Sequence, residues 1–159
     1  MSKKYERTRP RLLVICKNQQ ARNDLVTLLT GYGYYVDYVD SRAAGVLNYR
    51  AHKQAIIIMD VPALPQYPER MFKLFSMYRR NPVILIAAQI NEEAAVYPYM
   101  QQGVYDIVQL PLKPGYQHYI LRRLVEHSSL MAQNEFMKYM LSLGLLGIPV
   151  CVAALILLL

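Results

Sequence analysis

Few of the residues that build covalent or metal-centred sites occur in this sequence. Only two of its 159 residues are cysteines, Cys16 and Cys151, and the three histidines stand far apart, at positions 52, 118 and 127. A disulfide framework needs more cysteines than this, and a structural metal site needs ligands at close, regular spacing. We therefore expect no disulfide, no metal and no cofactor.

The sequence also lacks internal repeats, low-complexity segments and an apolar run near its start. Because the first residues, MSKKYERTRP, are mostly polar and basic, no secretory signal peptide is predicted. Neither a helix-turn-helix nor an aromatic-basic motif accompanies the net charge of +7, which argues against nucleic-acid binding. Residues 1–10 are expected to form a basic arm, either simply solvated or attracted to anionic lipid headgroups.

Charge is absent from the last twenty residues, 140–159, MLSLGLLGIPVCVAALILLL. A helix of that length spans about 30 Å, the thickness of the hydrocarbon core of a bilayer. We interpret the segment as a C-terminal transmembrane helix. The alternative is a buried helix, but such helices usually keep a polar stripe. Since all eighteen Lys and Arg residues precede position 139, the positive-inside tendency places the folded part in the cytoplasm.

Residues 11–127 alternate between apolar runs of strand length and segments of helical periodicity. Strands are predicted at 11–16, 34–39, 54–60, 82–88 and 104–110. The first helix is predicted to end near Gly31, and the second to carry Ala44 to Leu47 after a cap at Asp40 or Ser41. The third is predicted over 71–80 and the fourth over 92–102, capped by Asn91 and kinked or shortened by Pro98. The fifth is predicted to start near Gly115. Because parallel neighbours need crossover helices, the pattern predicts an α/β fold, a doubly wound five-stranded parallel sheet of flavodoxin-like order 2-1-3-4-5. Residues 128–139 then form a polar connector.

The run 54–60, QAIIIMD, ends on a single carboxylate, Asp60, and is the predicted central strand. In open α/β sheets, ligands and chemistry gather beyond the carboxyl ends of the strands. The following segment, Val-Pro-Ala-Leu-Pro-Gln-Tyr-Pro, contains three prolines and is expected to be an irregular loop over this crevice. Asp60 is therefore the candidate site residue.

Several landmarks occur in order along this region. They are Arg22 with Leu25, Leu28 and Leu29 in the first helix, Asp60 closing the third strand, Leu64-Pro65 in the next loop, Pro82-Val-Ile-Leu in the fourth strand, and Gly103-Val-Tyr-Asp-Ile-Val with Pro111 in the fifth. With this spacing, the chain resembles a bacterial response-regulator receiver domain over about residues 10–127.

The resemblance implies phosphoryl transfer to Asp60, assisted by Mg²⁺ on two acidic residues, a hydroxyl in the fourth strand, and a lysine and an aromatic residue in the fifth. The corresponding positions here hold other residues: Cys16 and Lys17, followed by Asn18, at the end of the first strand, then Ala87, Leu110 and Ile107. A thiol and an ammonium group cannot replace carboxylates for Mg²⁺, which prefers oxygen ligands. The resemblance thus implies a degenerate pocket, with Asp60 left as an inactive phosphoacceptor-like residue.

Two partners can satisfy the Asp60 carboxylate in such a pocket. One is a set of backbone amides. The other is the Lys17 ammonium group, which would form a permanent ion pair with Asp60 in the place where the receivers hold Mg²⁺. Such a pair need not be stabilising, because desolvation opposes the attraction.

The pattern as a whole predicts a non-catalytic pseudo-receiver that binds protein partners at the cytoplasmic face of a bacterial inner membrane, anchored by one C-terminal helix. Receivers commonly pair through the face of the fourth helix, fifth strand and fifth helix, which makes a homodimer an option. Here that face carries Tyr97, Met100, Tyr105, Tyr119 and Arg123. Two alternatives stay open: a phosphorylatable receiver that uses Asp60 in two-component signalling, and a structural subunit of a secretion or polysaccharide-export machine.

Overall fold

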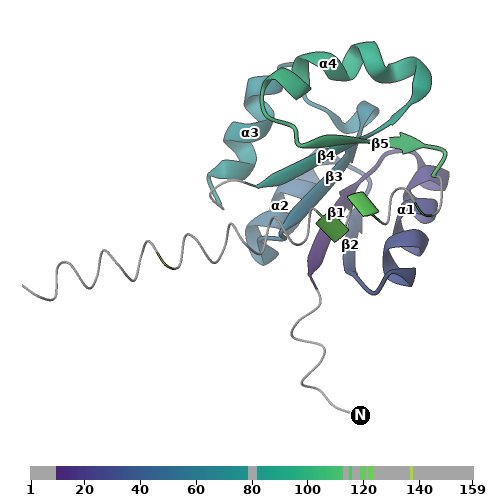
Figure 1. The fold of residues 1–159 in the computed structure, drawn as a ribbon. Coiled ribbons are helices and arrows are strands. Elements are labelled where there is room, and N and C mark those ends of the chain that lie inside the picture. Colours follow the sequence, from purple (N-terminus) through teal and green to yellow (C-terminus); the bar gives the residue numbers. More distant parts are fainter. Residues whose placement is uncertain are drawn as a thin grey trace, which may run out of the picture. The chain divides into compact units, whose positions relative to one another are not determined.

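Five parallel strands form one sheet in the order β2-β1-β3-β4-β5, as predicted (Figure 1). The computed structural model describes residues 10–78 and 82–112, together with 115, 119–120, 122–123 and 137. The chain divides into two compact units, Met1–Val125 and Glu126–Leu159, and the sheet belongs to the first. The strands are β1 (Arg11–Ile15), β2 (Tyr35–Val39), β3 (Ile56–Asp60), β4 (Val83–Gln89) and β5 (Asp106–Leu110), and the α-helices are α1 (Gln19–Gly31), α2 (Arg42–His52), α3 (Pro68–Ser76) and α4 (Glu93–Gln101).

Strand burial follows the position of each strand in the sheet. Every residue of β3 is buried, as are nearly all residues of its neighbours β1 and β4, because helices cover both faces of a parallel sheet. The outer strands β2 and β5 are only partly buried. The apolar run of residues 56–60 is thus central, and Asp60 lies at its carboxyl end.

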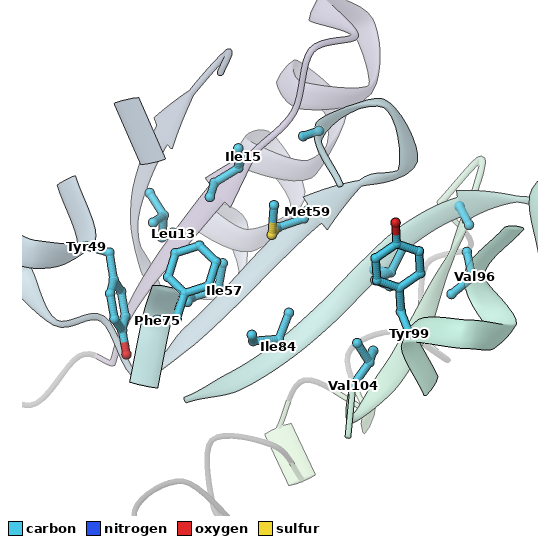
Figure 2. Close-up of a cluster of buried hydrophobic side chains, with 13 residues drawn as sticks. Leu13, Ile15, Tyr49, Ile57, Met59, Phe75, Ile84, Val96, Tyr99 and Val104 are labelled. Atoms are coloured by element: carbon cyan, nitrogen blue, oxygen red, sulfur yellow. The ribbon is translucent and has the colours of Figure 1, made fainter. Parts of the chain in front are cut away.

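The two faces of the sheet carry separate apolar cores. Helices α2, α3 and α4 cover one face, where their Tyr49, Phe75 and Tyr99 pack on alternate residues of β1, β3 and β4 (Figure 2). The rings of Tyr49 and Phe75 meet edge to face, with centroids 5.2 Å apart. Leu25 and Leu29 of α1 cover the other face. This division places α2 and α3 together on one side, where they contact each other.

Some predicted boundaries were wrong. The loop after Asp60 is not wholly irregular, because Val61–Ala63 form a 3₁₀ turn (η2) and α3 already begins at Pro68. Proline is favoured in the first turn of a helix, where its missing N–H has no partner in any case. Ser41 caps α2, as one of the two predicted caps, but Asn91 caps nothing. Instead, Gln89 and Glu92 form a capping box before α4.

The fourth helix was predicted to within one residue at each end, whereas the start of the fifth strand differs. Helix α4 continues beyond Pro98, and its buried residues Val96 and Tyr99 pack against the sheet on either side of the proline. This packing outweighs the hydrogen bond that proline removes. Strand β5 begins at Asp106 rather than at 104, because Val104 still closes the turn after α4 through a backbone bond to Tyr99.

Several predicted segments lie outside the described residues. They are residues 1–9 of the basic arm, Arg79-Arg80 at the predicted end of the third helix, most of the fifth helix, the connector 128–139 except for residue 137, and the predicted membrane span 140–159. In the part of the chain that the structure describes, no helix has the length and apolar character needed to cross a membrane.

A partly buried polar cluster joins β1, β2 and the segment between α2 and β3, at the end of the sheet opposite Asp60. Arg11 donates two hydrogen bonds to the Asp37 carboxylate, at 2.6 and 2.9 Å, and the Gln54 amide donates a third at 2.6 Å. Burial alone would raise the pKa of Asp37, but the bonds from Arg11 and Gln54 outweigh it and hold that pKa below its usual value. The ionised carboxylate therefore stabilises the folded state.

We expect Asp37→Asn to lower the free energy of unfolding at pH 7 by about 1.5–3 kcal/mol, the range for a hydrogen bond to a charged group. Because folding depresses the pKa, this contribution is present above the unfolded value of about 3.9 and is lost as the pH falls through the folded value. Urea unfolding of the full chain in mild detergent at pH 7, and at steps below pH 4, measures it. The exposed Asp24→Asn is the control, and a pH-independent difference between Asp37→Asn and the original chain would contradict the assignment.

Candidate functional site

Asp60 occupies the corner where the carboxyl ends of β1, β3 and β4 meet. It is the last residue of β3, is 3% exposed, and pairs in the sheet with Ala87 of β4. Cys16 follows the last residue of β1 on the other side. The structure thus brings together Asp60, Cys16, Lys17, Asn18 and Ala87, as the sequence predicted.

Three backbone amides hold the Asp60 carboxylate. One oxygen accepts hydrogen bonds from the amides of Lys17 and Asn18, at 2.7 and 3.2 Å. The other accepts from the amide of Ala63 at 3.0 Å, so that Asp60 caps the η2 turn. The carboxylate therefore ties the β1–α1 loop to the loop after β3, and its oxygens are already engaged by the protein.

Of the two partners expected for Asp60, the structure has the backbone amides and no ion pair with Lys17. Lys17 reaches Asp60 through its backbone N–H, and its side chain is exposed. Within the described residues, Arg11 and Asp37 form the only ion pair. The local backbone explains the difference: Asn18 caps α1 by accepting from the amide of Ala21, and the turn that leads into this cap directs the amides of Lys17 and Asn18 to the carboxylate.

The Cys16 thiol lies beside Asp60 and is fully buried. Burial, followed by the hydrogen bond and the charge of Asp60, raises its pKa to about 12. The thiol therefore stays protonated at neutral pH and donates to the Asn18 carbonyl at 3.3 Å. Arg22, a residue of the receiver-like pattern, donates to the Cys16 carbonyl at 3.0 Å and fixes the same loop.

These residues do not fit Mg²⁺, the ion that the receiver fold implies. Mg²⁺ needs several oxygen ligands in near-octahedral geometry. The corner offers one carboxylate, whose oxygens accept three amide bonds, beside a protonated thiol and the methyl group of Ala87. In the described residues, no three His, Cys, Asp or Glu side chains gather in a way that suits a metal ion.

The other two predicted pocket residues lie on β5 and are apolar. Ile107 pairs with Ile86 and packs on the core under α2, α3 and α4, whereas Leu110 pairs with Gln89 and packs on the core of the opposite face. Neither side chain carries a charge or a hydrogen-bonding group toward the Asp60 corner. Ile107 and Leu110 therefore contribute to the packing of the two apolar cores.

The five predicted interface residues do not share one environment. Tyr97 and Tyr119 are each 65% exposed, Tyr105 is about one-third exposed, and Arg123 is also exposed. Met100 instead packs partly against the core. Four of the five are therefore exposed at the surface.

A basic groove along α2 and α3 was not predicted. Two adjoining hollows of about 550 and 850 Å³ share Arg42, Gln66 and Leu74, and we call them together the α2–α3 groove. Its lining includes Lys17, Arg42, Arg70 and Lys73. These cations come from three separate segments, so only the fold reveals their proximity. The spacing of Arg70 and Lys73 by three residues was the one signal available in the sequence.

No protein-family model and no curated protein matches the sequence. Solved structures do match the fold. NtrX from Brucella abortus, in complex with ADP, is 12% identical with a TM-score of 0.71, over 80% of this chain but only 30% of NtrX. A response regulator receiver domain protein from Clostridium thermocellum is 14% identical with a TM-score of 0.66, over 77% of this chain and 98% of that one.

A third similar structure is a pilus assembly-related protein from Burkholderia pseudomallei. It is 21% identical with a TM-score of 0.60, over 72% of this chain and 88% of that chain. At these identities the likeness concerns the fold alone. The chain therefore has the receiver-like α/β fold of the response regulators.

Proposed function

We propose that this protein is a non-catalytic pseudo-receiver that binds protein partners at the cytoplasmic face of a membrane, held there by residues 140–159. The observation that carries the proposal is the Asp60 carboxylate, which accepts three backbone hydrogen bonds and, among the described residues, has no metal-binding or phosphoryl-binding side chain beside it. Phosphoryl transfer relies on electrostatic stabilisation of the transferred group, and the described residues that surround Asp60 direct no cationic side chain to its carboxylate. Without phosphoryl transfer, we propose that the receiver-like unit acts by binding a protein partner.

The exposed tyrosines support an adaptor role. Tyr97 on α4 and Tyr119 project from the surface, and tyrosine is enriched at protein interfaces because its rigid ring buries much area at little entropic cost. We propose that the face with Tyr97, Tyr105, Tyr119 and Arg123 binds the partner or a second copy of this chain.

The full-length protein in mild detergent is expected to retain a defined set of co-purifying partners that mass spectrometry identifies. Tyr119→Ala combined with Arg123→Glu should reduce their recovery at least about tenfold, as expected when central interface anchors are lost. Tyr38→Ala, on the exposed edge strand β2, is the matched control, because Tyr38 is 58% exposed and lies away from this face.

Recovery that is unchanged by the double variant would show that the partner uses another surface. A version that ends before Met140 separates the two regions: if it retains the same partners, the receiver-like unit recognises them and the C-terminal segment is a tether. If neither version retains a partner, the adaptor proposal itself fails.

A second candidate function is a signalling receiver that is phosphorylated on Asp60. The observation that favours it is the position of Asp60 at the carboxyl end of β3 in a fold shared with response regulators. Mg²⁺-dependent labelling by acetyl phosphate that vanishes in Asp60→Asn would support this candidate over the adaptor.

A further inference from the structure

We infer that the α2–α3 groove is a docking site for an acidic amphipathic helix of a protein partner. The inference deepens the proposed adaptor function and rests on it, but concerns a surface separate from the face with Tyr97 and Tyr119. Helices α2 and α3 pack against each other on the same side of the sheet (Figure 1). Residues of both helices line the groove. A pair of helices with a hollow along it is a common receptor for a third helix.

The charge of the groove has one sign. Lys17, Arg42, Arg70 and Lys73 line it, and none of the described lining residues is acidic. The single ion pair of the described chain, Arg11–Asp37, lies elsewhere, so these four exposed cations have no carboxylate partner among the described residues. A partner with glutamates or aspartates along its edges would complement them.

The groove also exposes apolar side chains between its cations. Leu47 of α2 and Met77, just after α3, are 68% and 69% exposed, while Leu74 forms part of the floor. Tyr67 is 45% exposed, and the guanidinium of Arg70 stacks on its ring at 4.8 Å. Apolar residues that alternate with cations match a helix with leucines on one face and acidic residues beside them.

A small phosphorylated ligand fits the groove less well. Phosphate groups are usually held by successive backbone N–H groups or at the N-terminus of a helix. Here the loop wall contains Pro62 and Pro65, which have no N–H, and the Ala63 amide is already donated to Asp60. At the N-terminus of α2, which also lines the groove, the Ser41 hydroxyl already accepts the Ala44 amide, and the cations of the groove are side chains from three separate segments. This spread of charge suits a long helical partner.

Asp60 gives this groove its shape. Two of the residues whose amides it binds, Lys17 and Ala63, line the groove, and Tyr99 hydrogen-bonds the carbonyl of Pro65 in the same wall. The corner that holds a phosphoryl group in the resembled receivers would here fix one end of a docking surface. In this proposal the residues of the degenerate pocket hold the docking groove in shape.

Fluorescence anisotropy of a labelled synthetic peptide tests the inference with the full chain in mild detergent. The peptide is helical, with leucines at i, i+3, i+4 and i+7 and glutamates at most other positions. A second peptide replaces every glutamate with glutamine. We expect the acidic peptide to bind at least about tenfold more tightly than its glutamine counterpart, and we expect its affinity to fall as the salt concentration is raised.

Variants locate the binding site. The double variant Arg42→Glu, Lys73→Glu should lower the affinity for the acidic peptide at least about tenfold, and Leu47→Ser, Met77→Ser about fivefold. All four side chains are exposed, so these substitutions should leave the fold intact. Arg50→Glu is the matched control on the same helix α2, since Arg50 is exposed but does not line the groove. Its effect should stay below about twofold.

Three results would overturn the inference: no binding of the acidic peptide, equal weakening by Arg50→Glu and the groove variant, or groove variants that lose binding to phosphatidylglycerol vesicles but keep the peptide. The last would assign the cations to a lipid surface. If the peptide fails while partners still co-purify with the chain, the groove inference falls and the adaptor function stands. If no partner co-purifies at all, the adaptor function falls with it.

Discussion

Asp60→Ala is expected to lower the free energy of unfolding by about 2–4 kcal/mol. The substitution leaves the amides of Lys17, Asn18 and Ala63 without their acceptor in a corner where Asp60 itself is only 3% exposed. An unsatisfied buried donor costs about 1–3 kcal/mol, and water can reach part of this corner through the exposed Lys17 and Asn18. Urea unfolding of the full chain in mild detergent, followed by far-ultraviolet circular dichroism, measures the loss.

Asp60→Asn separates this structural role from that of a vacant phosphoacceptor. The asparagine keeps one acceptor oxygen, but its NH₂ group turns a donor toward amide donors, so we expect roughly half the cost of alanine. In an acidic metal pocket, neighbouring carboxylates repel the aspartate, and its neutralisation would be harmless or stabilising. A neutral or stabilising Asp60→Asn would therefore contradict the structure, whereas Asp24→Ala, on the exposed side of α1, should stay within about 0.5 kcal/mol.

Much of the fold could be predicted because burial determines the residue types. The strands β1, β3 and β4 are covered on both faces, so their sequences are nearly continuous apolar runs, and their alternation with helices fixes a parallel sheet. Ends of elements were harder, because they depend on single local contacts. The capping box of Gln89 and Glu92 competes with Asn91, and Pro68 can equally well close a loop or open a helix.

The candidate site could be predicted in position but not in its hydrogen bonding. The sequence placed Asp60 at the end of a buried strand, yet its partners are backbone amides, which every residue except proline possesses. The types of the residues around Asp60 therefore could not indicate which amides bind its carboxylate. The charge of Lys17 instead suggested an ion pair, which does not form. The α2–α3 groove was missed for a related reason. Lys17 and Lys73 are far apart in the sequence, and only the packing of α2 and α3 on the sheet brings them to the same groove.

Incubation with acetyl phosphate and Mg²⁺ is expected to leave the protein unlabelled, whereas an active receiver domain treated in parallel becomes labelled. The Asp60 oxygens are bound by amides, and Cys16, Lys17, Ala87 and Leu110 stand where the resembled family holds its metal-binding and phosphoryl-binding groups. Without charge neutralisation the transition state loses its largest stabilising term, so this effect should be close to all-or-none. Phosphate-affinity electrophoresis and intact mass both report it.

Rebuilding the corner is the strongest form of this test. The variant Cys16→Asp, Lys17→Asp, Ala87→Thr, Leu110→Lys restores two carboxylates, a hydroxyl and an ammonium group around Asp60 without changing the backbone register. We expect it to gain Mg²⁺-dependent labelling that disappears when Asp60→Asn is added, and to be stabilised by Mg²⁺, since an ion that binds only the folded state adds to its stability. Labelling of the original chain, lost in its own Asp60→Asn variant, would instead show that amide-bound Asp60 is still a phosphoacceptor and would favour the signalling receiver. If the rebuilt chain folds, binds Mg²⁺ and still stays unlabelled, then the three amide bonds to Asp60, rather than the missing side chains, are what prevent the reaction.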